Sequence, residues 1–208
     1  MIITSCPLRI SLFGGSTDNP YFVEKYGRGS VISFTSSLKT YVTISQDKIG
    51  FNKDKHKYII NYSKREEVSS IKDIKNEVVR TVLEHFDMPP VQVTLTSDAY
   101  SQGSGLASSS SYTISLIKAC CLFFNLPITD NDACKLAFKL ERTYNPYCGY
   151  QDPYGCGWGA LKGLISSVGL LFGISFYLVL YLIILISILC LAVLLETPNE
   201  SSKKLHKT

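Results

Sequence analysis

A glycine- and serine-rich run from Gly103 to Ser111 is the segment whose residue types are best suited to hold a phosphate group. It lies between an expected strand and an expected helix, and the unpaired backbone N–H groups at the start of a helix favour an anion. Small side chains let the backbone approach a ligand closely, and the hydroxyls could bind phosphate oxygens or Mg²⁺. The run is neither a Walker A motif nor a complete dinucleotide-binding fingerprint. A flexible linker has a similar composition, but the ordered elements expected on both sides argue against it.

Short segments rich in β-branched and aromatic residues are expected to form the strands that position this run. Val31–Phe34 and Tyr41–Ile44 form the first two, with a turn containing two serines between them, and Tyr58–Tyr62 forms the third. A fourth strand is expected over residues 91–95, where apolar and polar residues alternate.

Three helices are expected around these strands. Apolar residues recur at three- to four-residue spacing from Ile71 to Phe86, which predicts an amphipathic helix that Pro89-Pro90 ends. Tyr112–Phe124 is apolar enough to be a largely buried helix directly after the glycine- and serine-rich run. Thr129 or Asp130 could cap a third helix.

The composition narrows the classes of partner and compartment. A chain of 208 residues is long enough for one domain with a proper core, or one and a half small ones. Its net charge of +4 comes from scattered Lys and Arg residues, which argues against a nucleic-acid partner and leaves anionic small ligands open. The seven cysteines include no C-x-x-C pair, and we interpret them as reduced thiols. The first residues do not resemble a secretory signal.

Three motifs resemble the GHMP kinases, a family of small-molecule kinases. Gly103–Ser111 is similar to the second family signature, G-x-G-L-G-S-S-S-A, and departs from it at Ala107 and Ser111. Because alanine adopts a positive φ less readily than glycine, a slightly altered loop is expected. Pro7–Asp18 resembles the first signature in the form found in heptose 7-phosphate kinases and related sugar-1-kinases. The third match is Glu141 with Asp152 eleven residues later.

The resemblance implies a role for each matched residue. Asp152 would be the catalytic base, Arg9 would lie near the transferring phosphate, and Glu141 with Ser109 would bind Mg²⁺. The implied nucleotide-binding residues are Gly103, Ser104, Gly105, Leu106, Ala107, Ser108, Ser109 and Ser110, and the implied sugar-binding residues are Gly14, Gly15, Thr17 and Asp18. Taken alone, Arg9 could equally form a surface ion pair and Asp18 could be a turn residue. The order of the three motifs favours the family roles.

The expected fold is therefore α+β, of the GHMP-kinase N-terminal type (ribosomal protein S5 domain 2-like), over residues 1–160. A mixed sheet would carry helices mainly on one side. The implied activity is ATP- and Mg²⁺-dependent phosphorylation of a sugar or sugar-phosphate hydroxyl in the cytoplasm, with the anomeric hydroxyl of heptose 7-phosphate preferred. The resemblance assigns no oligomeric state. Alternatives are a non-catalytic nucleotide- or sugar-binding remnant and a membrane-anchored protein with a degenerate kinase domain. Binding of Mg-ATP by residues 1–160 would separate the first two from the third, and turnover would separate the first from the second.

Residues 163–195 carry no charged side chain, and we expect residues 161–208 to be an apolar tail, helical or irregular. The interpretations are a membrane-spanning helix at about 170–195, a tail translated in a shifted frame, and a pair of buried helices. Family members continue with a ferredoxin-like domain and a third glycine-rich signature, neither of which residues 161–208 resemble. The shifted frame is therefore preferred, and a truncated enzyme would turn over little. Reading the other two frames after the codon for Gly159 would test this interpretation.

Overall fold

The computed structural model describes residues 1–46, 57–100, 104–159, 161–167 and 170–175. The chain divides into one compact unit over Met1–Ile174 and a second over Ser175–Thr208. The second unit lies almost wholly outside the described residues, so the account that follows concerns the first.

A seven-stranded mixed sheet is the base of the first unit. Its strands are β1 (Ile2–Phe13), β2 (Arg28–Ser45), β3 (Tyr58–Asn61), β4 (Arg65–Val68), β5 (Gln92–Ser97), β6 (Leu161–Ser167) and β7 (Leu170–Ser175). They run in the order β4-β3-β5-β2-β6-β7, and β1 pairs with β2. Strands β3 and β5 are parallel, whereas β1, β5 and β6 each pair antiparallel with β2.

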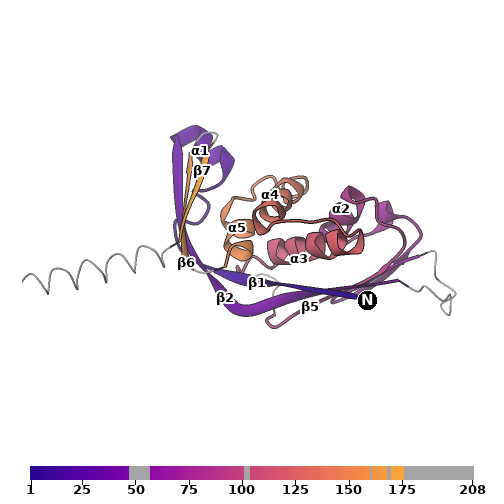
Figure 1. The fold of residues 1–208 in the computed structure, drawn as a ribbon. Helices are drawn as coiled ribbons and strands as arrows, with labels where there is room; N and C mark the ends of the chain where they lie inside the picture. Colours follow the sequence, from indigo (N-terminus) through magenta and orange to yellow (C-terminus); the bar gives the residue numbers. More distant parts are fainter. Residues whose placement is uncertain (47–56, 101–103, 160, 168–169, 176–208) are drawn as a thin grey trace, which may run out of the picture. The chain divides into compact units, whose positions relative to one another are not determined.

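Helices cover one face of this sheet. They are α1 (Pro20–Tyr26), a 3₁₀ turn η1 (Ile71–Asp73), α2 (Glu77–His85), α3 (Ser108–Phe123), α4 (Asp130–Glu141) and α5 (Gln151–Gly157). Figure 1 shows α2, α3, α4 and α5 on the same side of β1, β2 and β5. Helix α3 supplies fully buried residues such as Ile114 and Ile117, which join Val42 of β2 and Val93 of β5 in one apolar core. The expected α+β fold, with a mixed sheet and helices mainly on one side, is confirmed.

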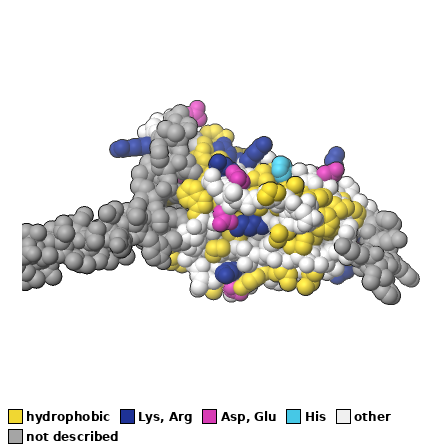
Figure 2. Space-filling model, in the orientation of Figure 1, with side chains coloured by type: hydrophobic (Ala, Val, Ile, Leu, Met, Phe, Trp, Pro, Cys, Tyr) yellow, Lys and Arg dark blue, Asp and Glu magenta, His cyan; other side chains and the backbone are white. Residues whose placement is uncertain are grey.

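Several local predictions are also confirmed. Strands occupy Tyr58–Asn61 and Gln92–Ser97, and a buried helix follows the glycine- and serine-rich run. Thr129 caps α4, because its side chain accepts the N–H of Asp132 at 3.1 Å. On the face drawn in Figure 2, Lys and Arg side chains lie apart among acidic and apolar ones, as the scattered charges predicted.

The turn expected between residues 34 and 41 is wrong, because residues 28–45 form one strand. Strand β1 pairs with β2 on both sides of the two serines, with Arg9 opposite Thr35 and Pro7 opposite Lys39. The surplus residues of β2 therefore form an irregularity in the ladder instead of reversing the chain. Serine is common in turns, but continuous pairing with a distant strand overrides that local preference.

The helix expected from Ile71 to Phe86 is divided. Residues 71–73 form the short turn η1, and α2 begins only at Glu77. The side chain of Asn76 caps α2 by accepting the N–H of Val79 at 3.1 Å. The apolar spacing predicted the buried face in part, since Ile74 and Val82 are fully buried but Val78 is only half-buried. Val79 and Leu83 complete the buried face, and the spacing did not reveal the cap.

The end of the described chain also differs from the expected tail. Residues 161–167 form β6, which pairs with β2 from Phe34 opposite Leu161 to Arg28 opposite Ser167, and residues 170–175 form β7. These residues are strands, not helical or irregular, so the expected boundary at residue 160 falls within the sheet. The rest of the proposed span at 170–195, and the tail after it, lie outside the described residues. Among the residues that are described, no helix is both long and apolar enough to cross a membrane.

Candidate active site

The start of α3 presents the glycine- and serine-rich run to one side of the sheet. Gly105 has φ +68°, and Ala107 has the left-handed conformation with φ 57° and ψ 40°. No side chain caps the helix, whose backbone bonding begins with the N–H of Ser111 and the carbonyl of Ala107 at 3.0 Å. Helix amides that precede the first such bond lack intrahelical partners and suit an anion. The N–H of Arg9 binds the carbonyl of Leu106 at 3.1 Å and so joins this loop to β1.

Replacing Ala107 by glycine is expected to stabilise the protein. A left-handed residue with a Cβ costs about 1–2 kcal/mol, and glycine removes that cost. We expect the free energy of unfolding to rise by about 1 kcal/mol and the Tm by about 2–4 °C, measured by denaturant and thermal unfolding. The control is Ala119→Gly in the buried middle of α3, which should destabilise the protein. A lower Tm for Ala107→Gly would contradict the prediction.

A buried carboxylate, Glu141 at the end of α4, faces the first turn of α3. It is 2% exposed, and its two oxygens accept hydrogen bonds from the hydroxyls of Ser109, at 2.7 Å, and Ser110. Burial raises the pKa of Glu141, and the two serine hydrogen bonds oppose that rise. The structure thus joins Ser109 and Glu141, the two residues expected to bind Mg²⁺.

The donor set at this point fits a hard cation. Carboxylate and hydroxyl oxygens are ligands that Mg²⁺ accepts, and Mg²⁺ usually completes its shell with water and substrate phosphates. Within the described ranges, no cluster of three or more His, Cys, Asp or Glu residues could hold a metal without such help. Ser109 and Glu141 could therefore share a metal ion with a bound phosphate, but could not enclose one.

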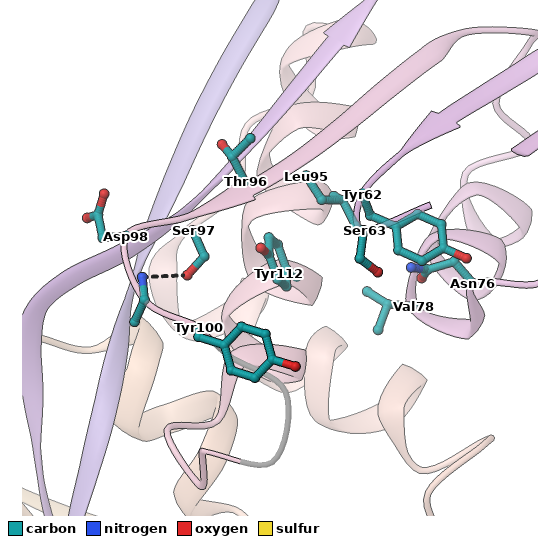
Figure 3. A pocket seen from close by; sticks show the side chains of 11 residues that line it. Tyr62, Ser63, Asn76, Val78, Leu95, Thr96, Ser97, Asp98, Tyr100 and Tyr112 are labelled. Carbon is teal, nitrogen blue, oxygen red and sulfur yellow. Dashed lines mark hydrogen bonds between the residues drawn. The ribbon is translucent and has the colours of Figure 1, made fainter. Parts of the chain in front are cut away.

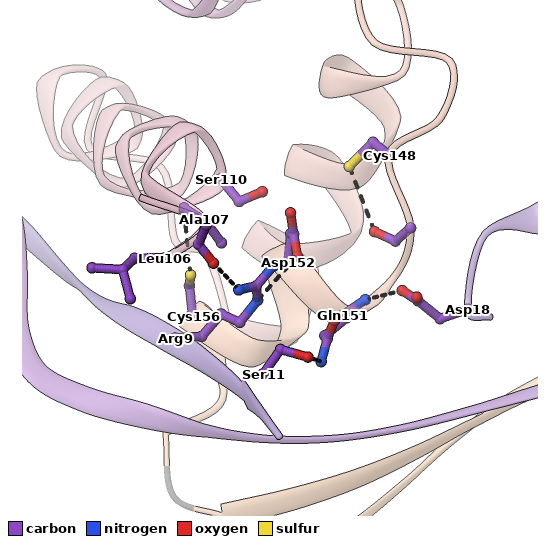
Figure 4. A network of polar contacts seen from close by, with 12 residues as sticks. Arg9, Ser11, Asp18, Leu106, Ala107, Ser110, Cys148, Gln151, Asp152 and Cys156 are labelled. Carbon is purple, nitrogen blue, oxygen red and sulfur yellow. Dashed lines mark hydrogen bonds and ion pairs between the residues drawn. The ribbon is translucent and has the colours of Figure 1, made fainter. Parts of the chain in front are cut away.

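Arg9 and Asp152 lie 143 positions apart in the sequence and are in contact in the structure. The guanidinium of Arg9 donates to Oδ1 of Asp152 through both Nε, at 3.0 Å, and Nη2, and its Nη1 donates to the carbonyl of Gly105 at 2.5 Å. Figure 4 shows this arginine between the catalytic-aspartate candidate and the start of α3. A Cβ on Gly155 would lie 3.1 Å from Cγ of Arg9, so the helix that carries Asp152 packs tightly on the arginine stem. One arginine thus fixes an aspartate beside the glycine- and serine-rich run.

Asp18 is directed toward the same helix. It is 2% exposed, and its Oδ2 accepts the backbone N–H of Gln151 at 2.5 Å. Burial raises the pKa of Asp18, whereas the hydrogen bond from Gln151 lowers it. A Cβ on Gly149 would lie 2.3 Å from Oδ2 of Asp18, so only glycine allows this approach. The sugar-binding role of Asp18 stays a prediction, and the contact shows in addition that Asp18 positions the residue next to Asp152.

The loop before Asp18 is held to β2 by tight backbone contacts. Gly14 has φ +80°, and a Cβ there would lie 2.0 Å from the carbonyl oxygen of Ser30. The hydroxyl of Thr17 lies 2.7 Å from the carbonyl oxygen of Gly14 and accepts the N–H of Ser30 at 3.1 Å. Thr17 is therefore occupied within the loop, whereas Gly15 lies beside the side chains of Ser11 and Gln151. Of the expected nucleotide-binding residues, Gly103 lies outside the described part of the chain.

Known proteins resemble this chain in sequence and in fold. Residues 73–160 match the family model described as GHMP kinases N terminal domain. The D-glycero-alpha-D-manno-heptose 7-phosphate kinase of Campylobacter jejuni is 31% identical over an alignment of 168 residues, which covers 77% of this chain and 49% of that protein. A D-glycero-D-manno-heptose 1-phosphate kinase from Bacteroides thetaiotaomicron superposes with a TM-score of 0.69 at 23% identity, over 84% of this chain and 59% of that one. The mevalonate kinase of Methanococcus jannaschii superposes with a TM-score of 0.63 at 20% identity, over 84% and 56%.

The part of the chain that includes residues 73–160 is a GHMP kinase N-terminal domain. The whole chain covers about half the length of the Campylobacter relative that it matches.

Both departures from the family signature have a structural account in this GHMP kinase domain. Ala107 adopts the left-handed conformation despite its Cβ, and the expected change in loop geometry stays a prediction. Ser111 is fully buried, and its hydroxyl lies 2.7 Å from that of Thr40 and donates to the carbonyl of Cys6 at 2.9 Å. The extra hydroxyl therefore has partners on the sheet.

Sequence reasoning missed several residues that complete the site. Gln151 donates from Nε2 to the hydroxyl of Ser11 at 2.8 Å, and the thiol of Cys148 lies 3.6 Å from Oε2 of Glu141. The hydroxyl of Tyr144 lies 3.2 Å from that of Ser109. The available signal was position, since Gln151 directly precedes Asp152 and the other two lie between Glu141 and Asp152. Six cysteines of the described part, Cys148 among them, are buried thiols.

A pocket of about 570 Å³ opens near the end of β5, before the glycine- and serine-rich run. Figure 3 shows the rings of Tyr62, Tyr100 and Tyr112 around it, with Asn76 and Val78 from the region of α2. The other lining residues are Ser63, Leu95, Thr96, Ser97, Asp98 and Ala99. Flat aromatic and polar groups around one space suit a planar heterocycle.

Proposed function

We propose that this domain is the nucleotide-binding and catalytic half of an ATP- and Mg²⁺-dependent kinase that phosphorylates a hydroxyl of a sugar or sugar phosphate. The anomeric hydroxyl of heptose 7-phosphate is the preferred acceptor, because relatives named for heptose phosphate kinase activity match this chain. The observation that carries the proposal is the position of Asp152, which Arg9 holds beside Gly105 of the phosphate-binding loop. We place the activity in the cytoplasm, where ATP is available.

Asp152 is the group that would orient and deprotonate the acceptor hydroxyl. Its Oδ1 is bound by Arg9, so the carboxylate is held in one orientation, and its side chain is 36% exposed, which leaves it accessible to a substrate. Arg9 also offsets the negative charge that Asp152 would otherwise place next to a phosphate. Asp18 and Gln151 would position α5 and, through it, Asp152.

The start of α3 would hold the phosphates of the nucleotide. Bound Mg-ATP supplies the transferable phosphoryl group and a cation that neutralises its charge. The chain contributes amides at the first turn of α3, the exposed hydroxyl of Ser109 and the carboxylate of Glu141. Ser110, 1% exposed, orients Glu141 from behind.

The tyrosine-lined pocket would receive the base of the nucleotide, and Glu66 fixes its wall. One oxygen of Glu66 accepts from the hydroxyl of Tyr62 at 2.7 Å and the N–H of Asn76 at 3.1 Å, and the other accepts the N–H of Lys75 at 2.6 Å. The hydrogen bond to Glu66 raises the pKa of Tyr62 to about 12, so the phenol stays protonated and keeps its donor role.

Glu66→Ala is therefore expected to weaken ATP binding about 3- to 10-fold, because Tyr62 and Asn76, which both line the pocket, lose the carboxylate oxygen to which they donate. Calorimetric titration with ATP measures the change. The matched control is Glu67→Ala, since Glu67 binds Arg65 at 2.6 Å and does not line the pocket. Equal effects of the two variants would mean that the pocket does not receive the nucleotide.

The proposed function is tested directly by titrating the chain with Mg-ATP and assaying phosphorylation of heptose 7-phosphate. Binding with turnover supports a kinase. Binding without turnover, in this chain and in one extended to the length of its relatives, would instead indicate a nucleotide-binding remnant. Absence of Mg-ATP binding would overturn the proposal.

A further inference from the structure

Arg142 is a cation close to the proposed sugar-binding loop. It follows Glu141 at the end of α4, and its guanidinium carbon lies 5.5 Å from the ring centroids of both Tyr21 and Phe138. Among the described residues it forms no ion pair. Aromatic rings hold a guanidinium by its face and leave N–H groups at its edge available to an anion.

The residues around Arg142 are connected to Asp18 and Asp152 by a short series of contacts. The Asp18 carboxylate binds the N–H of Gln151, next to Asp152, and Figure 4 shows Asp18 and Asp152 on opposite sides of Gln151. The adjacent residue, Asn19, donates from Nδ2 to the carbonyl of Tyr147 at 2.5 Å. The ring centroid of Tyr147 lies 6.2 Å from that of Tyr21, and the Tyr21 ring in turn lies against the guanidinium of Arg142.

Exposure and charge both change along this series. Tyr147 is 78% exposed and Tyr21 is 53% exposed, so their rings are accessible, whereas Asp18 and Glu141 are buried. The end near Asp152 carries three carboxylates, which repel an anionic group that brings no cation. The end at Arg142 carries a positive charge that no ion pair within the described ranges compensates. The exposed ring of Tyr21 lies against Arg142, and the exposed ring of Tyr147 lies next to that of Tyr21. Such an arrangement suits a ligand with a neutral hydroxyl at one end and an anion at the other.

We propose that Arg142, with Tyr21 and Tyr147, forms a subsite for the phosphate group of a sugar-phosphate acceptor whose reacting hydroxyl lies at Asp152. The inference rests on the proposed function and adds to it the residue that selects a phosphorylated over an unphosphorylated sugar. Arginine binds phosphate through paired N–H donors, and tyrosine rings can pack on the sugar carbons. Arg142 would contact the phosphate of the acceptor and not its reacting hydroxyl, so it is a specificity-determining residue and not a catalytic one.

The test compares two probes that differ only in the phosphate. D-glycero-D-manno-heptose 7-phosphate and the unphosphorylated heptose are titrated calorimetrically into the full chain, with and without a magnesium complex of a non-hydrolysable ATP analogue. The wild type is expected to bind the phosphorylated sugar more tightly. Arg142→Ala should weaken that binding about 10- to 100-fold and leave the unphosphorylated sugar within about twofold. Arg142→Lys should lose less, since it keeps the charge but not the paired donors.

Two further variants make the test specific. Arg65→Ala removes an exposed arginine of β4 that pairs with Glu67, and it should change neither affinity. Tyr21→Leu removes a ring that holds Arg142, and it should lower the preference for the phosphorylated sugar even if Arg142→Ala does not fold. The proposal is overturned if the wild type shows no preference, or if the Arg142 and Tyr21 variants affect both sugars equally. Failure of the wild type to bind the nucleotide analogue would count against the proposed kinase function, while the sugar titrations without nucleotide would still test Arg142.

Discussion

Asp152→Asn is expected to lower the rate of phosphoryl transfer about 10³-fold or more, while nucleotide affinity stays within a few-fold. An asparagine can still accept the hydrogen bond of Arg9 through its side-chain carbonyl oxygen, so the position of α5 should be kept. It cannot take a proton from the acceptor hydroxyl. Among the described residues, the side chain of Asp152 binds Arg9, and it is Arg9 that binds the backbone of the proposed phosphate-binding loop, which is why nucleotide affinity should change little.

The measurement is a steady-state assay together with an ATP titration, using a chain with measurable turnover. Asp130→Asn is the matched control, because Asp130 also pairs with a cation, Lys118 at 2.7 Å, but at an exposed site at the start of α4. We expect near wild-type rates from that control. If Asp152→Asn kept near-normal turnover, Asp152 would not be the base, and the pair with Arg9 would be structural.

Elements with a strong local pattern could be predicted from the sequence. The alternation of Val91, Val93 and Leu95 gave β5, and Thr129 marked the start of α4, because each signal is contained in a few neighbouring residues. Strand β1 was not predicted, and β2 was divided in two. Their pairing joins Ile2 to Ile44 and Phe13 to Ile32, and no local pattern reports such distant partners.

The residues of the candidate site could likewise be predicted in part. The resemblance singled out Arg9, Glu141 and Asp152 as site residues, and the structure brings Arg9 and Asp152 into contact across 143 positions. Composition could not say which serine of the run serves which purpose. Ser109 is exposed and reaches Glu141, Ser110 reaches it from a buried position, and Ser111 faces the sheet. That difference depends on the rotation of α3 about its axis, which is set by packing against β1 and β2.

The contact between Asp18 and Gln151 was also beyond sequence reasoning. Asp18 was expected to face a sugar, and nothing in its neighbourhood along the chain indicated a partner 133 positions away. Gly149 carried a partial signal, because a glycine in a turn can indicate a close approach of another group. The structure identifies that group as the Asp18 carboxylate. Motif residues can therefore combine a substrate role with a positioning role, and only the second is visible in contacts within the chain.

Glu141→Gln and Ser109→Ala are both expected to weaken the response to Mg²⁺, with the half-saturating Mg²⁺ concentration rising about tenfold or more. Glutamine keeps the size of Glu141, but it has one acceptor oxygen where the carboxylate has two, so it can accept from only one of the two serines. It also loses the negative charge that attracts the cation. Alanine at residue 109 removes one oxygen ligand and also the hydroxyl that orients Glu141 at 2.7 Å. The larger effect should come from Glu141→Gln, because a carboxylate binds Mg²⁺ more strongly than a hydroxyl does.

These variants are compared by titrating Mg²⁺ at saturating ATP and measuring both rate and nucleotide affinity. Ser115→Ala is the control, since Ser115 lies fully buried on the same helix and its hydroxyl has no hydrogen-bond partner in the described structure. It should leave the Mg²⁺ titration unchanged, so that a general loosening of α3 can be told apart from loss of a ligand. An unchanged titration in both Glu141→Gln and Ser109→Ala would remove these residues from the metal site. Their hydrogen bond would then serve only to hold α4 against the start of α3.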